Sequence, residues 1–430
     1  MKHIYTFILT VLSVALYAQQ TPAQPQSEAI ALEGATIHVG DGSIIENGLI
    51  VFENGIITHV GEASAKIARP ETVVQVAGKH IYPGFIVPTK SLGLVEINAV
   101  RASDDTDEIG DMIPHVRSLI AYNAESQVVE SLRQNGILLG QITPQGGRIS
   151  GTSSIVQFDA WNWEDAAVQT DDAIHLTWPS AFRNGRWWAG EPRGIRANNN
   201  YGEQVNEVIA FLKQAKTYLA GSQSPVNLPY KATAGIFNQT QRLFVYADGE
   251  REIRDAVTKL KELGIFQIVL VGGYQAENVS DFLLENEVPI LVHNGHEIPE
   301  LEDDAYDYVY GLAARLYQKG HLVGIQNASK SNFQVRNLPF YAGHSAQYGI
   351  DKEDALQLIT LNTAKILGIA ERYGSLEAGK SATLFVSEGD ALDMRGNQLT
   401  HAFIDGRGIS LETHQTKLWK RYSEKYANQN

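Results

Sequence analysis

Residues 243–293 read LFVYADGEREIRDAVTKLKELGIFQIVLVGGYQAENVSDFLLENEVPILVH, and in them short apolar runs alternate with helical stretches. Strands are expected at 243–247, 266–271 and 289–293, with helices at 250–263 and 276–286. Strands that are apolar along their whole length are typical of a parallel sheet buried on both faces. This stretch therefore predicts consecutive strand–helix units of an α/β fold.

The same alternation continues on both sides of that stretch. Further helices and strands are expected at 125–134, 137–142, 304–318, 322–326 and 340–367. Eight strand–helix units close a TIM barrel, and about six can be counted in the chain. The others must fall within 146–241, which is rich in Trp, Asn and Gly, resembles an enlarged loop region and has a helix near 204–219. We therefore expect a TIM (β/α)8 barrel over residues 83–371.

The two terminal segments have a different pattern, that of short strands and tight turns. In the first segment Asn54-Gly55 stands between two apolar runs, which predicts a β-hairpin. Two β segments at opposite ends of a barrel sequence suggest one composite domain. We expect a small β-sandwich formed by residues 28–82 and 372–410, followed by an acidic, aromatic tail at 411–430 that packs as a terminal helix.

Composition and the first residues restrict the partners and the compartment. The net charge of −14 over 430 residues argues against nucleic acid as a partner, and the absence of cysteine excludes disulfides and thiolate metal sites. Residues 1–18 have a short polar start, an apolar run from Ile4 to Tyr17 and Ala18 as the last residue before cleavage, as in a signal peptide. The mature protein is expected to be periplasmic or secreted, with a linker at 20–28.

Three stretches resemble the amidohydrolase superfamily, particularly its imidazolonepropionase-like branch: ATIHVGDG at 35–42, ALQLITLNTAKILG at 355–368 and YGSLEAGKSATL at 373–384. The resemblance implies a (β/α)8 barrel with a β-sandwich built from both termini. It also implies a divalent metal near the carboxyl ends of the barrel strands, whose bound water attacks a carbonyl or imine carbon. A carboxylate at the end of the last strand would act as general base.

Other residues occupy the places where that family has its metal ligands. Thr89 and Ser91 take the positions of two histidines on the first strand, and Tyr246 that of a histidine on the fifth. Gly272 and Asn327 stand at the positions expected for a histidine on the sixth strand and an aspartate on the eighth. Hydroxyl groups are poor zinc ligands beside imidazole and carboxylate, so no metal cofactor is expected at this set.

The remaining candidates for a pocket follow the later strands. His293, His296 and Glu297 lie on a loop after a strand, where they could bind zinc in an atypical site or serve as polar loop residues or substrate contacts. Arg336 and Asn337 could clamp a ligand carboxylate or make structural hydrogen bonds. Arg148 lies in a Gly-rich loop that either lines the mouth or is a turn.

Two main functional hypotheses follow from these residues. The first is an exported amidohydrolase-family protein without ordinary metal-dependent catalysis, a pseudoenzyme that binds a small molecule or partners an active relative in a homo- or hetero-oligomer. The alternative is an active hydrolase of a cyclic amide or peptide-like C–N bond that uses an atypical site around His293 and His296. A structural role in an envelope assembly is a third reading.

Overall fold

The computed structural model describes residues 21–97, 99–185, 187–190, 194–293, 295–327 and 331–427. The expected signal peptide at 1–18 lies outside these residues. Among the helices in this part of the chain, none is both long and apolar enough to cross a membrane.

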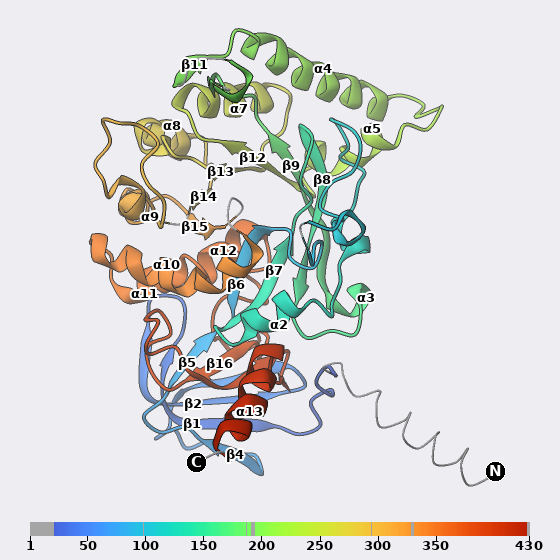
Figure 1. Cartoon of the computed structure of the whole chain (residues 1–430). Helices are drawn as coiled ribbons and strands as arrows, with labels where there is room; N and C mark the ends of the chain where they lie inside the picture. Colours follow the sequence, from blue (N-terminus) through green and yellow to red (C-terminus); the bar gives the residue numbers. More distant parts are fainter. Residues whose placement is uncertain are drawn as a thin grey trace, which may run out of the picture.

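An eight-stranded sheet forms the barrel, and the expected fold class is confirmed (Figure 1). Its strands are β6 (Phe85–Lys90), β7 (Ile137–Ile142), β8 (Ile149–Gln157), β9 (Ala167–Thr177), β12 (Arg242–Ala247), β13 (Ile268–Gly272), β14 (Ile290–His293) and β15 (Val323–Gln326). They pair in this order, and β15 lies beside β6, so that the ring is nearly closed. One strand departs from the expectation, because β8 runs antiparallel to both β7 and β9.

Helices cover the outside of the ring and its lower end. They are α2 (Gln127–Arg133), α7 (Glu250–Glu262), α8 (Ser280–Glu285), α9 (Tyr308–Gln318), α10 (Leu338–Ser345), α11 (Lys352–Gln357) and α12 (Leu361–Leu367). The longest of them, α7, buries Ile253, Val257 and Leu260 on one face. Acidic residues in its first turn and lysines in its last complement the helix dipole.

The stretch 146–241, expected as an enlarged loop region, supplies two of the barrel strands, β8 and β9. It also holds α3 (Trp163–Ala166), β10 (Phe182–Asn184), β11 (Ile195–Ala197), α4 (Tyr201–Ala220), α5 (Leu228–Ala232) and α6 (Ala234–Phe237). The helix expected near 204–219 is therefore α4. The bounds of these two strands could not be predicted from the sequence, because Ser and Thr interrupt the apolar pattern of β8, and Gln and Asp interrupt that of β9.

A second sheet joins the two terminal segments, and in Figure 1 its strands lie together below the barrel. It consists of β1 (Ile30–His38), β2 (Ile44–Glu53), β3 (Ile56–Glu62), β4 (Thr72–Gln75), β5 (His80–Pro83), β16 (Leu384–Ser387), β17 (Leu399–Ile404) and β18 (Arg407–Gly408). Strand β5 makes the connection, since it pairs with β1 on one side and β16 on the other. Asn54 and Gly55, both with positive φ, form the expected hairpin turn.

The tail forms the expected terminal helix, α13 (His414–Ala427), which contacts α2 through the backbone N–H of His414 and the carboxylate of Glu130. None of its residues is buried, and Trp419 is 69% exposed. It was wrong to regard this tail as acidic, because the helix carries four Lys and Arg residues against Glu424 alone.

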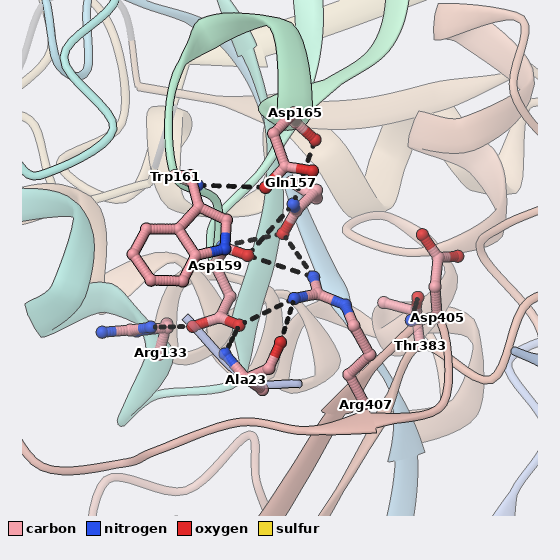
Figure 2. A network of polar contacts seen from close by, with 9 residues as sticks. All are labelled: Ala23, Arg133, Gln157, Asp159, Trp161, Asp165, Thr383, Asp405 and Arg407. Atoms are coloured by element: carbon pink, nitrogen blue, oxygen red, sulfur yellow. Dashed lines mark hydrogen bonds and ion pairs between the residues drawn. The ribbon is translucent and has the colours of Figure 1, made fainter. Parts of the chain in front are cut away.

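A buried ion-pair cluster joins the barrel, the terminal sheet and the first described residues (Figure 2). Asp159 lies just beyond β8 and is 2% exposed at its side chain. Its carboxylate accepts from Arg133 of α2 at 2.8 Å, from Arg407 of β18 at 3.0 Å and from the backbone N–H of Ala23 at 2.8 Å. Because every partner comes from a different part of the chain, this cluster fixes how the parts are joined.

Candidate functional site

The barrel interior changes from apolar to polar along its axis. Alternate residues of a strand face the same side, so each barrel strand sends one residue to the lower layer and one to the layer above. The lower layer is a hydrophobic cluster that includes Ile86, Leu139, Ile155, Ala173, Phe244, Val269 and Leu291. The layer above, toward the carboxyl ends of the parallel strands, contains hydrogen-bonding side chains instead.

The first polar group is a continuous hydrogen-bonded chain across β7, β8, β9 and β12. Tyr246 Oη lies 3.0 Å from His175 Nδ1, and His175 Nε2 lies 2.8 Å from Ser153 Oγ. Ser153 donates to Asp172 Oδ1 at 2.8 Å, and Gln141 donates to Asp172 Oδ2 at 2.6 Å. Tyr246, which stands where the family resemblance implies a histidine, is thus engaged with a histidine from the neighbouring strand.

Burial determines the protonation of this chain. It lowers the pKa of the His175 imidazole to about 3 and raises the pKa of the Asp172 carboxyl to about 6. His175 is therefore neutral at pH 7 and can donate from only one ring nitrogen. The sequence carried no usable pattern around His175, because Ser153 and Tyr246 come near it only through strand pairing.

The second polar group lies at the ends of β12, β14 and β15. His293 Nε2 is 3.1 Å from Asp248 Oδ1, and Gln326 Nε2 donates to His293 Nδ1 at 2.9 Å. Burial lowers the pKa of His293, but the hydrogen bond and charge of Asp248, with the charges of Glu297 and Glu300, together raise it by more, so the net shift is upward. Gly272 of β13 stands between the two partners with φ +98°, and a Cβ there would lie 2.5 Å from Asp248 Oδ1. The glycine thus makes room for the Asp248–His293 pair.

Among the described residues of this region, two buried side chains have no hydrogen-bond partner. They are Thr89, through Oγ1, and Asn327, through both Oδ1 and Nδ2, and their exposures are 2% and 0%. Their strands, β6 and β15, are neighbours, and the N–H groups of Ile86 and Ile325 bond to adjacent carbonyls. Thr89 and Asn327 therefore lie at the upper ends of two neighbouring strands.

The nearby residues of the first strand have other roles. Ser91 Oγ accepts from Gln145 at 3.2 Å, and its carbonyl accepts from Asn332 at 3.3 Å. Lys90 is 2% exposed, and burial lowers the pKa of its ammonium group to about 8. Arg148 donates to the carbonyl of Thr177, the last residue of β9, at 3.3 Å, so it lies at the rim of the mouth.

The other expected pocket residues do not join this set. His296 Nε2 lies 3.0 Å from His344 Nδ1 of α10, whereas His293 bonds to Asp248 and Gln326. The carbonyl of Arg336 accepts from Asn135, which precedes β7 at the opposite end of the barrel, and the Arg336 side chain is exposed. Asn337 begins α10 next to it. Glu297 lines a cavity with His296.

A divalent metal of the kind implied by the family resemblance does not fit these residues. Thr89 and Ser91 offer hydroxyls, the Tyr246 phenol is bonded to His175, and Gly272 has no side chain. Within the described ranges, no three His, Asp or Glu side chains come together in a way that could hold a metal ion. The described side chains at this mouth offer hydrogen bonding, together with proton transfer at the Asp248–His293 pair.

Comparisons with known proteins agree with this fold. Residues 320–410 match the model of the Amidohydrolase family. An adenine deaminase of Clostridium botulinum strain 657 is 21% identical over 403 residues, which are 92% of this chain and 59% of that protein. The amidohydrolase tasK of Hapsidospora irregularis is 21% identical over 394 residues, which are 84% of this chain and 39% of that protein. The chain thus spans about half the length of these relatives.

Among solved structures, an amidohydrolase from Thermotoga maritima superposes with a TM-score of 0.77 at 21% identity, over 89% of this chain and 99% of that chain. An adenosine deaminase from Xanthomonas campestris, solved with bound zinc, gives a TM-score of 0.54 at 13% identity, over 94% and 99% of the two chains. At such identities the likeness concerns the fold.

Proposed function

We propose that this chain is a member of the amidohydrolase superfamily whose barrel binds a small neutral molecule of the amide class without ordinary metal-dependent hydrolysis. The observation that carries the proposal is the pair of buried, unpartnered side chains Thr89 and Asn327. A buried polar group without a hydrogen bond costs about 1–3 kcal/mol, so such groups usually meet water or a ligand. An amide offers both a donor and an acceptor, which matches the side chain of Asn327.

The charges around this pair support a neutral rather than an anionic ligand. Asp248 lies on the same mouth, and so does Glu300, whose pKa is raised by burial and then by Asp248. A cyclic amide is uncharged, so it can form hydrogen bonds in this buried site without the free-energy cost of removing a charged group from water.

The test uses variants that keep shape and remove polarity. Thr89→Val and Asn327→Leu each delete an unsatisfied buried group, so we expect both to raise the unfolding free energy by about 1 kcal/mol. They should also abolish the rise in melting temperature that wild type shows with a cyclic amide such as hydantoin or 2-imidazolidinone. As a control, Thr360→Val removes a buried hydroxyl that donates to the carbonyl of Leu356 at 2.7 Å. It should lower stability and leave the ligand response intact.

Metal content separates the proposal from ordinary family chemistry. Protein purified without chelators and then incubated with excess Zn²⁺ should retain no stoichiometric metal and should not open the rings of the same amides by hydrolysis. Stoichiometric zinc with formation of the ring-opened acid would overturn the proposal. So would Thr89→Val and Asn327→Leu variants that lose stability and still respond to the ligand.

A second candidate, hydrolysis of a C–N bond without the ordinary metal set, is favoured by the Asp248–His293 pair. An imidazole held by a carboxylate can take a proton from an attacking water. His296 is bonded to His344 and not to this pair, so the candidate rests on His293 alone. Metal-free turnover that disappears in His293→Gln would establish it, and a complete lack of turnover would remove it.

We also propose export and association, on the strength of the sequence pattern at residues 1–18 and of the family resemblance. The expected product of signal cleavage begins at Gln19, which N-terminal sequencing of protein from the periplasm or medium would reveal. Association with itself or with an active relative would appear as a mass above 47 kDa in light scattering.

A further inference from the structure

A cavity of about 510 Å³ lies outside the barrel mouth, between the loop after β14, the first turns of α9 and the end of α10. Its walls include His296, Tyr306, Asp307, Tyr310, His344 and Tyr348. Its histidine, His296, is not part of the Asp248–His293 pair, because His296 bonds to His344 while His293 bonds to Asp248.

Aromatic rings make a continuous wall in this cavity. The ring centroid of Tyr310 lies 5.0 Å from that of His344 and 5.7 Å from that of His296. The His344 ring stacks on Tyr348 at 6.1 Å. The face of an aromatic ring carries negative electrostatic potential, so a wall of this kind attracts cations.

The charged groups at the cavity add to that potential. Two carboxylates, those of Asp307 and Glu297, belong to its lining, and the described lining residues include no Lys or Arg. Burial, and next the charge of Asp307, raise the pKa of the Tyr348 phenol, and Arg315 opposes this shift. The guanidinium of Arg315 is itself paired with Glu277 at 2.8 Å. The cavity therefore combines aromatic faces with a net negative charge.

We propose that this cavity is a binding site for an organic ammonium ion, held by cation–π contact with Tyr310 and Tyr348 and by the charge of Asp307. An ammonium group that carries alkyl substituents fits better than a bare metal ion, because its apolar surface matches the rings. The site is independent of the amide site at the barrel mouth, so either can fail without the other.

The test compares two ligands of nearly the same shape with the full chain. Choline carries a trimethylammonium group, and 3,3-dimethyl-1-butanol is its neutral counterpart. Calorimetry or saturation-transfer NMR should show saturable binding of choline and not of the alcohol. Tyr310→Leu should weaken choline binding about three- to fivefold, the loss of one cation–π contact.

Charge is tested by two substitutions in the same loop. Asp307→Asn keeps the shape and removes the charge, so it should weaken choline binding several-fold. Asp303→Asn makes the same change of net charge at a residue outside the lining and should have no effect. The proposal is overturned if both ligands bind equally, if neither binds at millimolar concentration, or if Asp307→Asn and Asp303→Asn behave alike. Thermal melts of each variant confirm that it is folded.

Discussion

Gly272→Ala is the substitution that most directly probes the mouth of the barrel. The new Cβ would lie 2.5 Å from Asp248 Oδ1 and 3.1 Å from His293 Nε2. Real Cβ atoms do not approach other atoms so closely, so the carboxylate must leave the imidazole. The residue would also be held at φ +98°, which costs an L-residue about 1–2 kcal/mol.

The expected size of the effect follows from these contacts. A hydrogen bond between charged groups contributes about 1.5–3 kcal/mol, but the Asp248 side chain is 45% exposed and solvent weakens the pair to about 1 kcal/mol. We expect Gly272→Ala to lower the unfolding free energy by about 2–3 kcal/mol in urea denaturation. The pKa of His293 should fall, because burial then acts without Asp248.

The matched control is Gly273→Ala, at φ +66°. The nearest neighbours of its Cβ would be apolar side chains, those of Leu270 at 3.1 Å, Ala276 at 3.2 Å and Ile290 at 3.4 Å. It should therefore show the backbone cost and leave the NMR titration of His293 unchanged. In wild type the stability given by protonated His293 is present at low pH and is lost as pH rises through its raised pKa. An unchanged His293 titration in Gly272→Ala would refute the reasoning.

Three further substitutions test the buried charges and the exposed helix. Asp159→Ala should lower the unfolding free energy by about 3–5 kcal/mol in urea, because Arg133 is left buried without this carboxylate; a loss below about 1 kcal/mol would contradict this. The raised pKa of Asp172 stabilises the folded state at low pH, and up to about 3 kcal/mol is lost as pH rises from 3.8 to about 6. The unfolding free energy of Asp172→Asn should not fall over this pH range, and a pH dependence identical to that of wild type would contradict the prediction. Trp419→Ala should change the free energy of unfolding by less than about 0.5 kcal/mol, and a larger loss of stability would mean that Trp419 of α13 is buried in solution.

The regular part of the barrel could be predicted from the sequence because its strands and helices have a hydrophobic periodicity that is visible within a few neighbouring residues. The runs at 243–247 and 289–293 are apolar throughout, and helix 250–263 has a clear apolar face, so their types follow from periodicity. Strand β8 was missed for the opposite reason: its buried Ser153 and Ser154 look like loop residues until a partner satisfies their hydroxyls.

The candidate site was only partly predictable. Tyr246, Gly272 and Asn327 were identified from the metal-ligand positions that the family resemblance implies, and His293 by its place at a strand end. His175 and Asp248 were not, since hydrogen-bonding partners on different strands have no fixed spacing along the chain.

The sequence by itself determined the alternation of strands and helices, the composite character of the termini and the kinds of side chain at the strand ends, because each depends on residues close together in the chain. Only the tertiary structure decided which of these side chains meet. His175 reaches Ser153 because β8 runs backwards against β9, and Asp248 reaches His293 because Gly272 leaves space between them. These contacts depend on the order and direction of the strands and on the absence of a Cβ at Gly272. They join residues that are far apart in the sequence, so no local pattern predicts them.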